Sequence, residues 1–382
     1  MSPLPLFPSS IIGSMPRPAH VRELIAGDAD PLDAGYRSDM ERAIREVVAM
    51  QEEAGLDVVS DGEWWRKSYI GVIAELAHGF ELSLNPADGR PWTIVVDRLS
   101  PRQPGFIARE VEYLKTLTSR AIKTAIPAPA LLGERMWDQE KSSAAYPTRE
   151  DFVRDCVPIL RREVELLQQS GATIIQVDDP HLCLFVDDQV RAGYRDPDQA
   201  ADFSVDMNNQ LIDGIEDVTM AVHLCRRAGA RARGEADHAG GFEKIMPQLR
   251  RLRAGHVTLE FTTPGAGEMS VLQQLPEDVQ VGLGCAVARR TRERSFYMTK
   301  QLAFQQAFTQ RPTVHFDKWA AGSFAQFMDS VGNQLLAGAG FTKQEHGCRA
   351  ARYLPGQLVD LLHGHAVADN SRQWARFVRT RI

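Results

Sequence analysis

The sequence predicts an α/β fold, a (β/α)8 barrel of the TIM type, and three observations lead to this prediction. Short β-branched runs that end in a polar or acidic residue alternate with longer helical patterns, as parallel strands with crossover helices require. The length of 382 residues is one at which such barrels form a single domain. No low-complexity linker or long charge run divides the chain. We therefore expect one barrel domain over residues 1–382, with a divergent C-terminal part at 286–382.

Each predicted strand is a short run rich in β-branched residues and bounded by glycine, proline or polar residues. In chain order the runs are residues 10–13, 57–60, 92–96, 122–126, 173–177, 220–224, 256–259, 279–283 and 313–316. This is one run more than an eight-stranded barrel uses.

Two of the intervening helices have clear sequence signals. We expect one over residues 38–54, where Ser38 followed by Glu41 forms the pattern of a capping box. The other covers residues 151–170, in which apolar residues recur at helical spacing. Gly55 and Gly171 stand where a left-handed residue would end each helix.

Composition and charge exclude several classes of protein. The chain is 43% hydrophobic and 25% charged with a net charge of -6, so it lacks the positive excess that favours nucleic-acid binding. Its 5 cysteines are widely spaced and odd in number, which suits a reducing compartment better than a disulfide framework. The start does not resemble a signal peptide, and no apolar run approaches about 18 residues. We expect a cytoplasmic protein that binds neither nucleic acid nor membrane.

Polar residues gather where the predicted strands end, which is the face that carries the chemistry of such barrels. These residues are Gly13, Ser14, Glu63, Asp178, His223, Cys225, Glu260 and Cys285. Any one of them alone is more often a loop residue, a helix cap or a buried core residue. Because several strands contribute to the same face, we interpret the set as a functional site.

The most specific chemistry in this set is that of zinc. His223 and Cys225 are two residues apart in a predicted strand, so their side chains point to the same face, and Glu260 ends the next strand. One nitrogen, one thiolate and one carboxylate are ligands that zinc accepts, whereas magnesium and calcium prefer oxygen alone. An open position would bind a substrate thiol and ionise it, so that it accepts an alkyl group. Asp178 and Glu63 would hold the ammonium of an amino-acid thiol.

Several motifs give the chain a family resemblance. They are residues 12–18, 61–66, 175–180, 223–225 with Glu260, and 240–243. In these motifs, over residues 8–285, the chain resembles the cobalamin-independent methionine synthase family, specifically its short members similar to the C-terminal catalytic half of that enzyme. The resemblance implies zinc ligation by His223, Cys225 and Glu260. It also implies thiol contacts from Gly13 and Ser14, and amine contacts from Glu63 and from Asp178, the predicted catalytic residue.

Two departures from the family pattern concern the metal and the alkyl donor. Trp319 stands where the family has its fourth zinc ligand, a cysteine, so Cys285, Cys348 or water would complete the coordination, and we include Cys285 in the predicted set. The family's synthases also carry a histidine that helps to protonate the folate, whereas residues 285–290 contain none. His181 and His238, or Arg289 and Arg290, are alternatives that would serve a different donor.

The leading hypothesis is zinc-dependent transfer of a methyl or other small alkyl group from a small-molecule donor to a homocysteine-like thiol. Two alternatives stay open. One is a family sibling that acts on an epoxide or as a carbon–sulfur lyase, because the short members use several electrophiles. The other is a barrel without metal that has no catalytic activity. The identity of the alkyl donor and the existence of a homodimer are also left open by the sequence.

Overall fold

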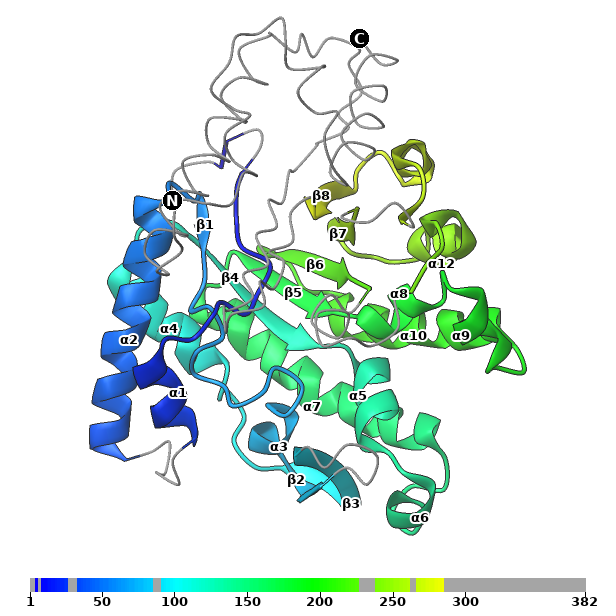
Figure 1. Cartoon of the computed structure of the whole chain (residues 1–382), viewed down its shortest axis with the longest axis horizontal. Helices are drawn as coiled ribbons and strands as arrows, with labels where there is room; N and C mark the ends of the chain where they lie inside the picture. Colours follow the sequence, from blue (N-terminus) through cyan, green and yellow to red (C-terminus); the bar gives the residue numbers. More distant parts are fainter. Residues whose placement is uncertain are drawn as a thin grey trace, which may run out of the picture.

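A curled parallel sheet forms the centre of the protein (Figure 1). The computed structural model describes residues 4–5, 8–26, 33–84, 91–226, 238–261 and 266–284. Within these residues the sheet has 6 strands in the order β1-β4-β5-β6-β7-β8, and each pair of neighbours is parallel. The strands are β1 (Val58–Val59), β4 (Ala121–Pro127), β5 (Ile174–Asp178), β6 (Thr219–Leu224), β7 (His256–Glu260) and β8 (Gln280–Gly284). This curled sheet confirms the predicted TIM-type α/β class.

The long helices precede the strands and lie along the outer side of the sheet (Figure 1). They are α2 (Ala34–Glu53), α4 (Ala108–Leu117), α7 (Arg149–Ser170) and α10 (Pro197–Ile212). The shorter helices are α1 (Ala19–Ala26), α3 (Ile73–Leu76), α5 (Pro129–Met136), α6 (Gln139–Ser142), α8 (Pro180–Leu184), α9 (Asp188–Ala192), η1 (Phe242–Ile245), α12 (Met246–Leu249) and η3 (Met269–Gln274). Within the described ranges, none of the helices has both the length and the apolar character of a membrane span.

Helix α7 ends at Ser170 as predicted and begins two residues earlier than predicted, at Arg149. The hydroxyl of Thr148 accepts a hydrogen bond from the backbone N–H of Asp151, and Gly171 ends the helix with a left-handed φ of 86°. The start of α2 was predicted wrongly. This helix begins at Ala34, because the carboxylate of Asp33 accepts the N–H of Tyr36 at 2.9 Å and caps the helix upstream of Ser38.

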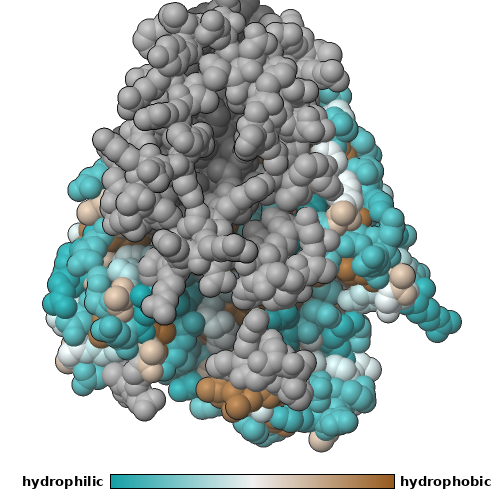
Figure 2. Space-filling model, viewed as in Figure 1, coloured by the Kyte–Doolittle hydropathy of each residue, from teal (hydrophilic) through white to brown (hydrophobic). Residues whose placement is uncertain are grey.

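The predicted strand at residues 92–96 is extended but does not belong to the barrel. It lies in β3 (Pro91–Pro101), which pairs antiparallel with β2 (Ala77–Leu84) in a separate two-stranded sheet. A short β-branched run indicates extended backbone but not its pairing partner, so the prediction that it enters the barrel was wrong. Figure 2 shows a mostly hydrophilic surface with an apolar patch at this end of the molecule, and β2 carries the exposed side chains of Leu82 and Leu84. The predicted strand at 313–316 lies outside the described residues.

The predicted first strand, residues 10–13, makes a single parallel bridge, between Ser10 and Val58. Side chains from the sheet hold its other backbone groups. The Lys123 ammonium of β4 donates to the Ile11 carbonyl and, at 3.2 Å, to the Ser10 hydroxyl. The Gln176 amide of β5 donates to the Ile12 carbonyl at 3.0 Å.

An apolar layer forms near the amino ends of the strands and leaves the polar residues at the other end. This layer consists of Val58, Ala121, Ile174 and Ala221, with Leu4 packed against it. The main core fills the space between the sheet and the helices, where the buried side chains of α7 point inward. The carboxyl edge of the sheet is therefore the place at which the fold brings polar side chains together.

Candidate active site

The predicted site residues of the central strands lie at the carboxyl edge of the sheet. Asp178 is the last residue of β5 and Glu260 the last of β7, while Cys225 directly follows β6. In the strand register Asp178 is paired with His223, and His223 with Thr258. The parallel sheet thus places the carboxylates of two strands on either side of the strand that carries His223 and Cys225.

Asp178 and His223 form a buried pair. The Nδ1 atom of His223 lies 2.9 Å from Oδ1 of Asp178, and each residue is only 7% exposed. The other ring nitrogen, Nε2, is buried and makes no hydrogen bond to a nitrogen or oxygen atom of the described residues. Burial alone would lower the pKa of His223, but its interactions with the thiol of Cys225 and the carboxylate of Asp178 raise it to about 10. The ring therefore presents Nε2 on the side away from Asp178.

Ser14 and Glu63 come together from two loops. The Ser14 hydroxyl donates to the Glu63 carboxylate, and a Cβ at Gly13 would lie 3.0 Å from Oε1 of Glu63, so only glycine leaves this approach uncrowded. Glu63 has a left-handed φ of 58°. A hydrogen bond of 3.0 Å from its backbone N–H to the carboxylate of Asp61 stabilises this conformation. Burial raises the pKa of the Glu63 carboxyl, Asp178 raises it further, and Arg66 and Ser14 oppose the shift.

Two arginines hold the turn that carries Glu63. Arg17 donates to the backbone carbonyl of Glu63 at 2.7 Å and to that of Arg66. Arg66, itself buried, pairs with Glu110 at 2.6 Å and donates to the Ala125 carbonyl at 2.7 Å. Burial raises the pKa of Glu110 to about 8, although Arg66 opposes the shift. The motif at 61–66 indicated Arg66, but no local signal indicated Glu110, which lies in the first turn of α4.

Arg226 anchors Glu260, and sequence reasoning did not identify it. Its backbone N–H donates to Oε2 of Glu260 at 2.7 Å, and its guanidinium donates to the Glu260 carbonyl at 2.8 Å and to the Gly240 carbonyl at 2.6 Å. Gly240 approaches the backbone so closely that a Cβ would lie 1.9 Å from the carbonyl oxygen of Val186. The guanidinium is completely buried and lies over the Phe242 ring at 4.6 Å. Arginine seldom has so buried a structural role, so its residue type gave no signal.

The described part of the chain contains no group of three His, Cys, Asp or Glu side chains arranged to hold a metal ion. It does contain the predicted donor types, with His223 next to Cys225 and Glu260 at the end of the adjacent strand. A buried imidazole nitrogen without a nitrogen or oxygen partner among the described residues, beside a thiol, fits the donor chemistry of zinc. Cys285 and Cys348, the predicted alternatives for a further ligand, lie outside the described residues.

His181 and His238, the two histidines predicted as alternatives for the alkyl donor, have surroundings that differ from those of His223. Nδ1 of His238 lies 3.1 Å from the Asp187 carboxylate. His181 packs edge-on against Phe185, with 5.3 Å between ring centroids, and burial lowers its pKa. It lines a cavity of about 420 Å³ between α7 and α10, which Tyr194 also lines.

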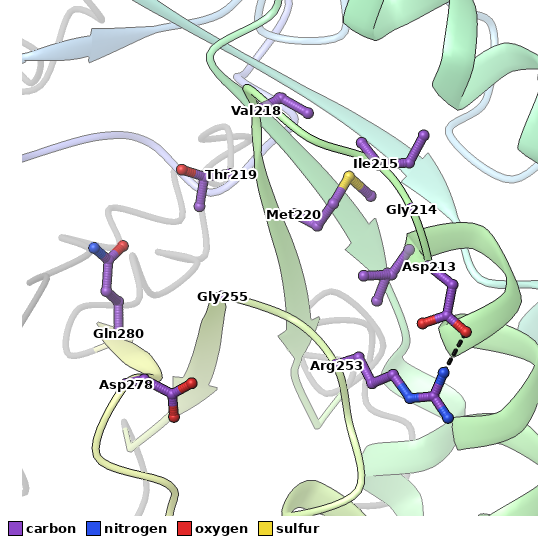
Figure 3. A pocket seen from close by; sticks show the side chains of 11 residues that line it. Asp213, Gly214, Ile215, Val218, Thr219, Met220, Arg253, Gly255, Asp278 and Gln280 are labelled. Atoms are coloured by element: carbon purple, nitrogen blue, oxygen red, sulfur yellow. Dashed lines mark hydrogen bonds and ion pairs between the residues drawn. The ribbon is translucent and has the colours of Figure 1, made fainter.

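A second cavity, of about 410 Å³, opens at the opposite end of the strands (Figure 3). Thr219 and Met220 begin β6 there, Gln280 begins β8, and Arg253 forms an ion pair with Asp213. Active sites of TIM-type barrels lie at the carboxyl ends of the strands, so we do not assign the active site to this cavity.

Comparison with known proteins identifies a family for the chain. The family model described as cobalamin-independent synthase, catalytic domain, matches residues 7–302. The 5-methyltetrahydropteroyltriglutamate--homocysteine methyltransferase of Bacillus licheniformis is 27% identical over 296 residues, which are 74% of this chain and 35% of that protein. The methionine synthase of Pyrococcus horikoshii is 26% identical over 292 residues, which are 74% of this chain and 75% of that protein. The chain therefore spans about a third of the length of the Bacillus relative.

Solved structures agree in fold. The B12-independent methionine synthase from Shewanella sp. W3-18-1, solved with selenomethionine, has a TM-score of 0.60 at 19% identity, covering 99% of this chain and 100% of that one. A putative vitamin-B12 independent methionine synthase from Listeria monocytogenes has a TM-score of 0.55 at 17% identity, covering 74% and 81%. With the match of the family model over residues 7–302, these findings show that the chain belongs to the cobalamin-independent synthase catalytic-domain family.

Proposed function

We propose that this protein catalyses the zinc-dependent transfer of a methyl or other small alkyl group to the sulfur of a homocysteine-like thiol. The observation that carries the proposal is the buried Nε2 of His223, which has no nitrogen or oxygen partner among the described residues and lies in a ring held by Asp178 next to Cys225. Family membership supports the reaction class, because the named relatives are methionine synthases and a homocysteine methyltransferase.

His223, Cys225 and Glu260 would hold the zinc ion, and Cys285 is our candidate for a further ligand. Bound zinc would lower the pKa of a coordinated substrate thiol, so that a thiolate exists at neutral pH. The chain's own residues prepare this site. Asp178 holds the His223 ring through Nδ1, and Arg226 fixes one oxygen of Glu260.

Two buried carboxylates are the proposed binding site for the substrate ammonium. Glu63 and Asp178 lie close enough that the charge of Asp178 raises the pKa of Glu63. A bound ammonium would offset this repulsion and would donate charge-assisted hydrogen bonds to both carboxylates. Gly13 and Ser14 border the same carboxylate and would contact the bound amino-acid thiol. Asp178 thus serves as the catalytic residue that touches the substrate.

In the proposed reaction the thiolate sulfur attacks the alkyl carbon, forming a carbon–sulfur bond as the bond to the leaving group breaks and its electrons leave with that group. The site would orient the sulfur through the ammonium contacts at Glu63 and Asp178. We propose that residues 1–382 form one domain of a cytoplasmic enzyme that acts on small molecules.

A second candidate uses the same thiol-activating site with an epoxide as the electrophile, or in the reverse direction as a carbon–sulfur lyase. The observation that favours it is the lack of histidine in residues 285–290, where the family's synthases have a proton donor for folate. Assaying the zinc-loaded protein with an amino thiol and either a methylated folate or a short epoxide separates the two candidates.

The decisive variant for both candidates is Cys225→Ala. Without the thiolate ligand, zinc binding and thiol alkylation should both be lost. Zinc content and turnover are measured on wild type and variant after expression with ample zinc. Turnover retained by the variant would rule out the zinc mechanism, and wild-type protein with less than about 0.2 zinc per chain would favour a metal-free barrel.

A further inference from the structure

Gln176 lies at the centre of the site but has no role in the proposed chemistry. It is two residues before Asp178 in β5, so both side chains point to the same face of the sheet. The side chain is 1% exposed, and its amide nitrogen donates to Oδ1 of Asp178 at 2.8 Å and to the Ile12 carbonyl at 3.0 Å. A glutamine amide has two N–H donors, and these two acceptors use both.

The hydrogen bond from Gln176 orients the Asp178 carboxylate, so that its two oxygens have different surroundings. Oδ1 accepts from Gln176 and also lies 2.9 Å from Nδ1 of His223, whereas Oδ2 makes no hydrogen bond to another described residue. In the neutral ring that a metal requires, an Nδ1–H donated to Asp178 leaves the lone pair on Nε2. Gln176 therefore holds the carboxylate that holds the imidazole, and it leaves Oδ2 for the substrate.

The bond to Ile12 fixes a segment with little backbone support. Residues 10–13 make one parallel bridge to the sheet, at Ser10, so the carbonyl of Ile12 depends on Gln176 for its hydrogen bond. The next residue, Gly13, has the close approach to Glu63, and the Ser14 hydroxyl donates to that carboxylate. A shift of Ile12 would move this substrate-binding loop.

We propose that Gln176 is a positioning residue that couples the metal-binding side of the site to the substrate loop. Through Asp178 it orients His223, and through Ile12 it keeps Gly13 and Ser14 against Glu63. This inference rests on the proposed function, because it assigns a zinc ligand and a thiol site to the two groups that Gln176 joins. The side-chain amide of Gln176 thus supports both zinc affinity and thiol binding.

The test compares Gln176→Met with a matched control. Methionine is unbranched and similar in length to glutamine but has no N–H donor. Gln248→Met is the control, because Gln248 is also buried and its amide donates to the Asp202 carboxylate at 3.0 Å, on α12 outside the barrel. Zinc affinity is measured by competition with a chromophoric chelator, thiol KM by steady-state kinetics, and stability by thermal unfolding.

We expect Gln176→Met to bind zinc about 10- to 100-fold more weakly and to raise the thiol KM, since loss of an outer hydrogen-bond partner has such effects on metal sites. Gln248→Met should lower stability and leave both quantities within about twofold of wild type. If Gln176→Met does not fold, Gln176→Leu gives the result, because it also lacks both N–H donors and adds no charge. Zinc affinity and KM unchanged in a folded Gln176 variant would overturn the inference. Wild-type protein that binds no zinc would overturn the proposed function and the metal half of the inference with it.

Discussion

At the scale of single residues, the site brings together two carboxylates that would repel each other without a cation. Glu63 is buried, and the charge of Asp178 adds to the effect of burial in raising its pKa. Arg66 lowers the pKa of Glu63, but its guanidinium is hydrogen-bonded to Glu110 and to the Ala125 carbonyl. The proposed substrate ammonium would add a positive charge that both carboxylates can bind.

Replacing Glu63 by Gln tests this assignment. The variant keeps the shape but loses the charge, so KM for an amino thiol should rise about 10- to 100-fold, the range for one charged hydrogen bond. A thiol of the same length without an amino group is the matched control substrate, and its KM should stay near the wild-type value. Equal effects on both substrates would show that Glu63 does not bind the amine.

Lys123 provides a pH test away from the proposed metal ligands. Burial lowers its pKa from 10.5 to about 8, although Asp178 and Glu63 oppose the shift. Between these two values the unfolded chain binds more protons than the folded one, so the free energy of unfolding should rise with pH. The slope from one group is at most about 1.4 kcal/mol per pH unit.

Lys123→Met should lack this rise between pH 8 and 10, as measured by urea unfolding at several pH values. The neighbouring His256 does not interfere, because burial and the Lys123 charge lower its pKa to about 3 and it stays neutral throughout. The same pH profile in wild type and variant would refute the assignment of the lowered pKa to Lys123.

Motif resemblance indicated Gly13, Ser14, Glu63 and Asp178, and strand spacing indicated the His223–Cys225 pair; the structure brings Ser14 to Glu63 and Asp178 to His223. Gln176 lay inside a predicted motif, yet its role depends on Ile12, which is 164 positions away in the chain. Arg226 and Glu110 have partners that are also distant in sequence. Tertiary hydrogen bonds of this kind leave no local pattern for a sequence to display.

At the scale of elements, local signals predicted α7 better than α2. Thr148 and Gly171 cap α7 as their residue types indicate, and the buried stripe follows the helical period. In α2 two candidate caps compete, and Asp33 wins because it accepts the N–H of Tyr36. The hairpin of β2 and β3 went unpredicted because pairing partners are chosen by tertiary contacts.

The cap of α7 gives a stability prediction at this scale. Thr148→Ala removes the acceptor for the N–H of Asp151 and should lower the free energy of unfolding by about 1 kcal/mol, measured by denaturant titration. Thr148→Ser keeps the hydroxyl and should remain close to wild type. A loss of stability as large in the serine variant would mean that the methyl group, rather than the cap, stabilises the helix.

At the scale of the whole molecule, the barrel separates an apolar end from a polar one. The layer of Val58, Ala121, Ile174 and Ala221 lies near the amino ends of the strands, while Asp178 and Glu260 end their strands at the opposite edge. The alternation of strands and helices was enough to predict the fold class, because each parallel strand needs a crossover segment before the next. The coordination of a metal could not be predicted to the same depth, because Cys285 and Cys348 have no motif that fixes their place.

The central claim is that the protein activates a thiol by binding its sulfur to zinc at His223, Cys225 and Glu260. X-ray absorption at the zinc edge of the metal-loaded protein, before and after homocysteine is added, tests this claim most directly. We predict that the zinc gains one sulfur neighbour at about 2.3 Å when the thiol binds. Sulfur coordination that does not change at a saturating thiol concentration would contradict the account.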